Sequence, residues 1–186
     1  KDMGAYVEAQ GDPSKEASWK GIAFGLAFSS SVKAVPMPPA ISMALTKSGA
    51  PRIVYMGTDS QTSGKRQITY FECDADCIED RWRATRLVET QKLGAGIDLA
   101  LDGAEHPRFV HTVDYSIGLG RCDSAQCGND DSKWVITKVE NGSDMKPDEI
   151  FLYDNCTVGA WFLHSPSLAI TPDGRPRVGY QARDIS

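Results

Sequence analysis

The sequence predicts an all-β protein built of β-propeller blades, forming a partial propeller or one that closes by oligomerisation. The first observation is a segment that occurs three times, at residues 41–55, 97–111 and 166–180. The second is a set of short runs with two-residue periodicity, separated by turn residues such as Asp173-Gly174. Four short antiparallel strands per repeat, in tandem, describe a propeller blade.

The composition is that of a globular chain with room for one hydrophobic core. Of its 186 residues, 41% are hydrophobic and 24% are charged. A net charge of -5 argues against nucleic acid as the default partner, because phosphate binding needs a basic surface. No apolar run approaches ~18 residues, so no membrane span is expected. Because the chain starts at Lys1 without an initiator methionine, we expect a piece of a longer product.

Residues 1–34 match only the second half of a repeat unit. A run over residues 4–10 and another over residues 19–24 are separated by a polar loop. Trp19 stands where both later units place a tryptophan. We therefore predict the last two strands of a split blade, followed by a linker.

Residues 41–96 are predicted to form the first complete blade. Its second strand begins at Pro51, where the missing N–H of a proline costs little. Its third strand ends at Cys73, a short cysteine loop follows, and the fourth strand begins at Trp82.

Residues 97–165 repeat the same order and are predicted to form a second blade with an insertion at 141–165. Residues 166–186 then supply only the first two strands of a further split blade. The chain thus holds two complete blades and two complementary halves. Three blades are too few to close, since propellers have ~4–8, whereas two copies would give six. The sequence favours the remainder of a longer propeller chain over a homodimer, and both alternatives stay open.

The five cysteines indicate the compartment. Cys73 with Cys77, and Cys122 with Cys127, occupy equivalent places in successive units. Zinc sites favour two residues between cysteines and four ligands, whereas these pairs are separated by three and four residues. Local disulfides are therefore favoured, and they indicate an oxidising compartment: secreted, periplasmic or cell surface. Cys156 is either a free buried thiol or the partner of a cysteine outside this chain.

The combined pattern resembles secreted bacterial repeat proteins with non-catalytic, sialidase-like propeller blades. The residues that carry the resemblance are 167–180 for the first half of a blade, and 70–77 with Trp82 for the second half. It implies the fold and an extracytoplasmic location, but it is a poor indicator of activity. The chain departs from the pattern in the N-terminal half-unit, which has Gln10 near the place where a cysteine is expected, and at His111, where the other copies have tyrosine.

The repeated residues are predicted to be structural. A sialidase would need an aspartate-box turn, which we do not find, and arginines clustered for a carboxylate. Arg52, Arg108 and Arg177 recur in register, which is typical of framework residues. The recurring tryptophans are expected to pack between neighbouring blades, with each indole N–H finding a partner.

The segment that breaks the repeat is the candidate binding region. Tyr153, Trp161, Phe162 and His164 are its candidate partner-binding residues, because loops on a rigid scaffold often bind. The alternative is that the segment adds a strand or caps an edge. We expect a scaffold or binding module with a protein or glycan partner at the cell surface. The alternative function is a carbohydrate-binding or glycoside-hydrolase propeller.

No catalytic residues and no cofactor are predicted. The chain has no nucleophile elbow, phosphate loop or metalloprotease helix, so an enzyme is less expected than a binding module. Asp74, Asp76, Asp130 and Asp131 could bind a structural calcium ion through oxygen ligands. None of them belongs to a spaced calcium-binding loop, so solvated turn acids are the favoured interpretation.

Overall fold

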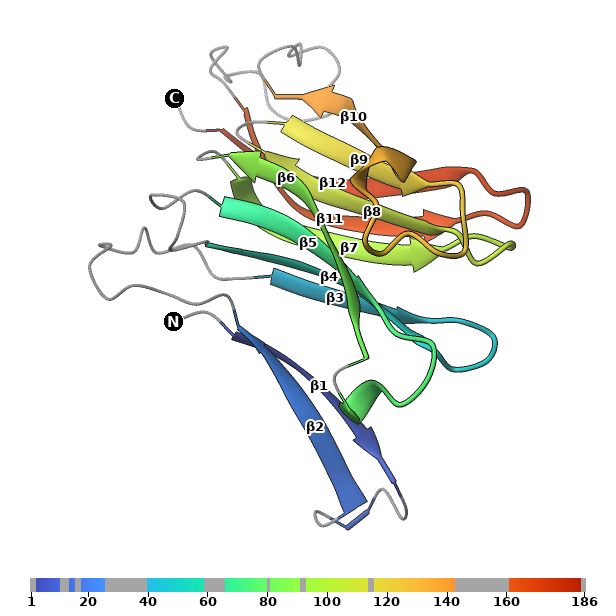
Figure 1. Cartoon of the computed structure of the whole chain (residues 1–186). Coiled ribbons are helices and arrows are strands. Elements are labelled where there is room, and N and C mark those ends of the chain that lie inside the picture. Colours follow the sequence, from blue (N-terminus) through green and yellow to red (C-terminus); the bar gives the residue numbers. More distant parts are fainter. Residues whose placement is uncertain are drawn as a thin grey trace.

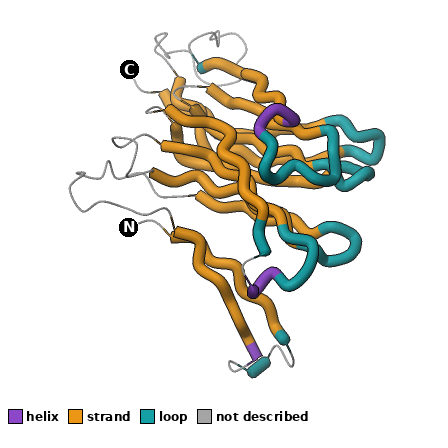
Figure 2. The backbone as a smooth tube through the Cα atoms, in the orientation of Figure 1, coloured by secondary structure: helices purple, strands orange, loops and turns teal. Residues whose placement is uncertain are grey.

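The structure is a computed structural model that describes residues 3–10, 14–15, 18–25, 40–58, 66–79, 81–90, 93–113, 116–142 and 161–184. Within these residues all paired strands are antiparallel and no α-helix is present, which confirms the predicted all-β class (Figure 1). Figure 2 shows that short loops and single helical turns join the strands. No described helical segment is long and apolar enough to cross a membrane.

Two four-stranded meanders form the centre of the molecule, as the repeat predicts. The first sheet contains β3 (Ala40–Leu45), β4 (Pro51–Thr58), β5 (Arg66–Glu72) and β6 (Arg83–Thr90), in that order. The second sheet contains β7 (Leu93–Leu101), β8 (Pro107–Val113), β9 (Ser116–Cys122) and β10 (Trp134–Asn141), also in that order. The single turns η2 (Cys77–Glu79) and η3 (Asp131–Lys133) follow β5 and β9.

The two half-units form separate two-stranded sheets. These are β1 (Met3–Ala9) with β2 (Trp19–Gly25), and β11 (Trp161–Ile170) with β12 (Pro176–Asp184). β7 begins four residues before the predicted start at residue 97, and β11 begins five residues before residue 166. In both strands the register shifts just after the start, between Leu93 and Ile97 and between His164 and Ser167. This irregular pairing hides the two-residue alternation from sequence inspection.

The sheets stand next to one another in chain order. Strand β7 packs against β3 on one side and against β11 on the other, so the first strands of three consecutive units are adjacent (Figure 1). Strand β2 contacts η2 of the first sheet, just as β6 contacts η3 of the second sheet. The hairpin β1–β2 therefore sits where the outer strands of a preceding unit would lie.

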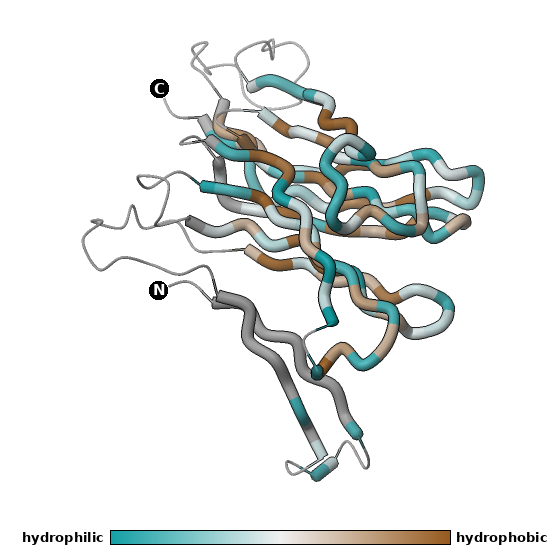
Figure 3. The backbone as a smooth tube through the Cα atoms, in the orientation of Figure 1, coloured by the Kyte–Doolittle hydropathy of each residue, from teal (hydrophilic) through white to brown (hydrophobic). Residues whose placement is uncertain are grey.

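The hydrophobic core lies between the sheets and alternates along each strand. Phe109 packs into the cluster shared with the first sheet, together with Tyr70 and Trp134. Its neighbour Val110 points the other way, into the cluster shared with β11 and β12. Figure 3 shows the apolar residues alternating with polar ones along these strands.

Two glycines of β9 make room for the aromatic residues of β8. Gly120 pairs with Phe109 and Gly118 pairs with His111. A Cβ atom at either glycine would collide with the ring opposite it. The rings therefore lie flat over β9, which brings His111 and Phe109 onto the face turned towards the first sheet.

Candidate functional site

Each complete unit carries a short cysteine loop between its third and fourth strands. The sulfur atoms of Cys73 and Cys77 lie 2.14 Å apart, and those of Cys122 and Cys127 lie 2.02 Å apart. Both predicted pairs are therefore at disulfide distance. Cys156 lies outside the described residues.

The arginines that recur in the repeat hold these loops from one side. Arg52 donates to the carbonyl oxygen of Cys73 at 3.1 Å and to the carboxylate of Asp74 at 2.7 Å. Arg108 repeats both contacts, to the carbonyl oxygen of Cys122 at 2.6 Å and to the carboxylate that follows it at 2.7 Å. Both guanidinium groups are thus engaged with their own loop.

The recurring tryptophans hold the same loops from the other side. The indole N–H of Trp82 donates to the carbonyl oxygen of Cys77 at 2.7 Å, and that of Trp134 donates to Cys127 at 3.1 Å. We call the arginine, the cysteine pair and the tryptophan of one unit its clamp. The same clamp is built twice from residues at matching places in the repeat.

Trp134 also packs between neighbouring sheets. Its ring centroid lies 4.9 Å from that of Tyr70 in the first sheet and 5.5 Å from that of Phe109 in its own sheet. Such tilted pairs are favourable ring arrangements. The prediction that this tryptophan packs between units, with a partner for its N–H, agrees with this geometry. The side chain of Trp19 lies outside the described residues.

A fully buried carboxylate joins the two clamps. Glu72 accepts hydrogen bonds from Arg83 at 2.9 Å, from the hydroxyl of Tyr70 at 3.2 Å and from the backbone N–H of Cys127 at 3.0 Å. Burial and the neighbouring Glu72 charge raise the pKa of Tyr70 well above its ordinary value, so its hydroxyl stays protonated and donates. Because Cys127 belongs to the second unit, this carboxylate fixes one unit against the next.

A second carboxylate joins the first strands of three units. One oxygen of Asp98 in β7 accepts from the hydroxyl of Ser42 in β3 at 2.9 Å. Its other oxygen accepts from the backbone N–H of Leu168 in β11 at 2.8 Å. Sequence reasoning did not single out either carboxylate, because the contacts connect residues more than 50 positions apart.

Replacing Asp98 by alanine is expected to lower the free energy of unfolding by about 2 kcal/mol, because it leaves donors from both neighbouring units without their acceptor. Urea denaturation monitored by fluorescence measures this change. Asp173→Ala is the matched control, since Asp173 lies in an exposed turn, and it should shift stability by less than about 0.5 kcal/mol. Equal effects of the two variants would show that Asp98 does not connect the units.

The predicted partner-binding residues are only partly brought together. Tyr153 lies outside the described residues, and Trp161 begins β11 although its side chain is not described. Phe162 and His164 are half-buried on one side of β11, with their rings stacked at a centroid distance of 5.8 Å. Both residues lie at the start of β11 and so extend the first strand of the last unit.

Phe162 and His164 lie on a surface that no other described strand covers. The opposite side of β11 carries Leu163 and Leu168, which are buried against the second sheet. We call the uncovered side the open face. Its residues are Phe162, His164, Ser167, Ala169, Arg177, Gly179, Gln181 and Arg183.

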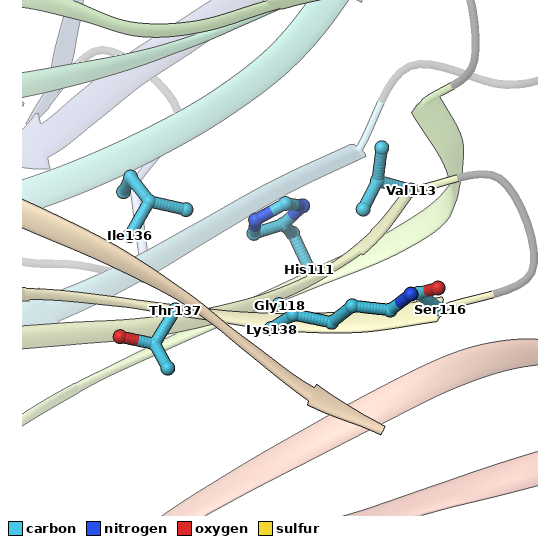
Figure 4. Close-up of a pocket in the computed structure, with 7 residues that line it drawn as sticks. All are labelled: His111, Val113, Ser116, Gly118, Ile136, Thr137 and Lys138. Carbon is cyan, nitrogen blue, oxygen red and sulfur yellow. The ribbon is translucent and has the colours of Figure 1, made fainter. Parts of the chain in front are cut away.

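A pocket of about 300 Å³ lies beside the buried His111 (Figure 4). Its lining residues come from three strands of the second sheet: His111, Val113, Ser116, Gly118, Ile136, Thr137 and Lys138. Neither ring nitrogen of His111 has a hydrogen-bond partner among the described residues. Burial lowers the pKa of His111 to about 4, so the ring is neutral and offers one donor and one acceptor to the pocket.

Two of the four acidic residues considered for calcium, Asp74 and Asp130, are used in other ways. Asp74 is held by Arg52 and Arg83. Asp130 caps η3 by accepting from the backbone N–H of Ser132 at 3.1 Å. Among the residues that the structure describes, no group of three or more His, Cys, Asp or Glu is arranged to hold a metal ion.

No protein-family model, no curated protein and no solved structure matches this chain. The functional proposal therefore depends on the geometry of the described residues.

Proposed function

We propose that this chain is a non-enzymatic β-propeller module of an oxidising, extracytoplasmic compartment, where it acts as a rigid scaffold for binding another macromolecule. The observation that carries the proposal is the clamp, which occurs in the same form in both complete units. A disulfide in each clamp fits the oxidising compartment. The repeated use of arginine and tryptophan for loop support fits a framework role.

The arrangement of the sheets supports a propeller. Each complete unit is a four-stranded meander, and the first strands of consecutive units lie side by side. In a propeller the first strand of each blade lies nearest the central axis, and neighbouring blades pack face to face. The cores between sheets and the Asp98 contacts fit such packing.

The state of the repeated arginines favours a scaffold over a sialidase-like enzyme. Binding a substrate carboxylate would require guanidinium groups that face a common cleft. Arg52 and Arg108 instead donate to the cysteine loops of their own units, and Arg52 is buried. Guanidinium groups engaged in this way do not face a common cleft.

The two disulfides are expected in the mature protein. Mass spectrometry of unreduced peptides should show Cys73 linked to Cys77 and Cys122 linked to Cys127. Replacing both Cys122 and Cys127 by serine should lower the free energy of unfolding by about 2 kcal/mol, as estimated for closing such a short loop. Free thiols at all four positions in protein isolated from its native compartment would contradict the oxidising location.

The scaffold function is tested by comparing turnover with binding. A panel of fluorogenic glycosides should give no turnover above that of the heat-denatured protein. Pull-down under native conditions should recover a protein partner. Replacing uncharged, exposed residues outside the clamps should abolish this recovery. Turnover that is lost on replacing a single acidic residue would overturn the non-enzymatic proposal.

A further inference from the structure

Strand β12 takes the place of a central strand in its unit but lies at an edge of its sheet among the described strands. Pro176 pairs with Ile170 as Pro51 pairs with Leu45, so β12 takes the same place in its unit as β4. β4 and β8 are each paired on both edges and are largely buried. β12 pairs only with β11 among the described strands, and most of its residues are exposed. The described residues of this unit therefore provide its first two strands, without a third and a fourth.

The hairpin β1–β2 has the register of those two missing strands. In β5, Tyr70 and Glu72 precede the cysteine loop, and Tyr6 and Glu8 take the same places in β1. Glu8 pairs with Lys20 just as Glu72 pairs with Arg83.

This register also gives the position of the missing cysteine. Trp19 pairs with Ala9 as Trp134 pairs with Cys122. Ala9, the residue before Gln10, therefore takes the place of the first cysteine. The hairpin thus matches strands three and four of a unit, and no described strand stands at the place of the first two.

The exposed hydrophobic residues mark the surfaces that these missing strands would cover. Ile41, Met43 and Leu45 on β3 are 46%, 50% and 55% exposed. Their counterparts in the next unit, Ile97 and Leu99, are 8% and 6% exposed because the first sheet covers them. The face of β3 that carries these three residues is therefore where the inner strands of a preceding unit would pack, and no described strand covers it.

A second exposed apolar surface lies on β10. Val135 and Val139 are exposed. In the first sheet, Thr85 of β6 takes the place that Thr137 has in β10, and it is buried against the cysteine loop of the second sheet. Val135 and Thr137 lie on the same side of β10, since alternate residues of a strand share a face. A third and a fourth strand added to the β11–β12 sheet would cover this side of β10. Among the described residues, every exposed large hydrophobic side chain except Ile136 lies on one of these two surfaces.

We propose that a second copy of this chain covers both surfaces, with β12 of one copy pairing along β1 of the other to complete a four-stranded blade. The open face of β11–β12 would then pack over Ile41, Met43 and Leu45 of the partner. This inference rests on the proposed propeller. Three units are too few to close a ring, whereas two copies give six, within the usual range of ~4–8 blades.

The register predicts a specific contact across the new pairing. Arg52 pairs with Glu72 in the first sheet, so Arg177 is expected opposite Glu8 of the partner copy. Arg177 is exposed. In the dimer it would donate to the carbonyl oxygen of Ala9, as Arg52 and Arg108 donate to the loops of their own units.

Solution mass gives the first test. Light scattering behind size exclusion should give about 40 kDa, twice the 20.2 kDa of one chain. Met43→Glu places a charge in the proposed interface and should weaken dimerisation by about tenfold or more. Ile136→Glu is the matched control, because Ile136 is exposed but lies outside both surfaces, and it should leave the dimer intact.

Cross-linking between copies gives the second test. Residues 7 and 178 correspond to the paired positions Phe71 and Ile53 of the first sheet. Val7→Cys is therefore made in one chain and Val178→Cys in another, and both chains also carry Cys156→Ser. Opposed residues in an antiparallel pair have the Cα spacing that a disulfide needs. Mixing and air oxidation should give a covalent dimer. Ala104→Cys replaces Val178→Cys as the control and should give none.

The outcomes separate this inference from the scaffold proposal. A monomer that forms no cross-link while retaining both native disulfides would overturn pairing with a second copy and leave the scaffold standing. A chain carrying both cysteines that cross-links only to itself, at the mass of one copy, would also overturn it. Free thiols at the native cysteine pairs, or enzymatic turnover, would instead contradict the scaffold proposal.

Discussion

Glu72→Ala is expected to lower the free energy of unfolding by about 3 kcal/mol. Glu72 is fully buried and accepts from Arg83, from Tyr70 and from the backbone N–H of Cys127. Alanine would leave the last two donors buried without an acceptor, and removing one partner of a buried charged network is far more costly than removing an exposed pair. Because Cys127 belongs to the next unit, contact between the two clamps should weaken as well.

Chemical denaturation of Glu72→Ala and Glu79→Ala tests this expectation. Glu79 is exposed on η2, so its replacement should change stability by less than about 0.5 kcal/mol. Adding Tyr70→Phe to Glu72→Ala should recover about 1 kcal/mol, since it removes one orphaned hydroxyl. A loss below 1 kcal/mol for Glu72→Ala would mean that the carboxylate does not hold the units together.

Acid should destabilise this protein through His111. Burial lowers the pKa of His111 to about 4 in the folded state, from its usual value of 6.5. Between these values the unfolded chain binds a proton that the folded chain does not. Stability due to His111 is therefore complete above pH 6.5 and is lost as the pH falls towards 4, by up to about 3 kcal/mol.

The measurement is the free energy of unfolding at pH 7 and at pH 4 for wild type and for His111→Phe. Carboxylates also titrate over this range, so the difference between the two proteins isolates His111. The variant should lose about 3 kcal/mol less than wild type. Parallel profiles for wild type and His111→Phe would refute the prediction.

The parts of the fold that could be predicted are those encoded locally. The alternation along residues 41–45 and the Pro-Arg pairs located the strands, and the close spacing within each cysteine pair favoured local disulfides. The starts of β7 and β11 were missed, because Gly96 at a φ of 132° and the shift after His164 interrupt the alternation. Propensity and periodicity carry no signal for such irregular pairing.

The candidate site was predicted less completely, because its main contacts join distant segments. Glu72 and Asp98 are ordinary acidic residues in the sequence, and only folding brings them to donors from other units. His111 was noticed only as a departure from tyrosine. Its burial depends on Gly118 opposite it, which a single sequence does not reveal.

The two ends of each sheet are built under different constraints. Both clamps lie at the end reached after β5 and β9, where arginine, disulfide and tryptophan fix the loops. The connections from β4 to β5 and from β8 to β9 leave the sheets at the other end, without cysteines in the sequence between them. We therefore expect changes in the length and sequence of those connections to disturb the strand register less than changes in the clamps. One end of the sheets would then keep the strands in place, and the opposite end would be where loops can change to give a new binding specificity.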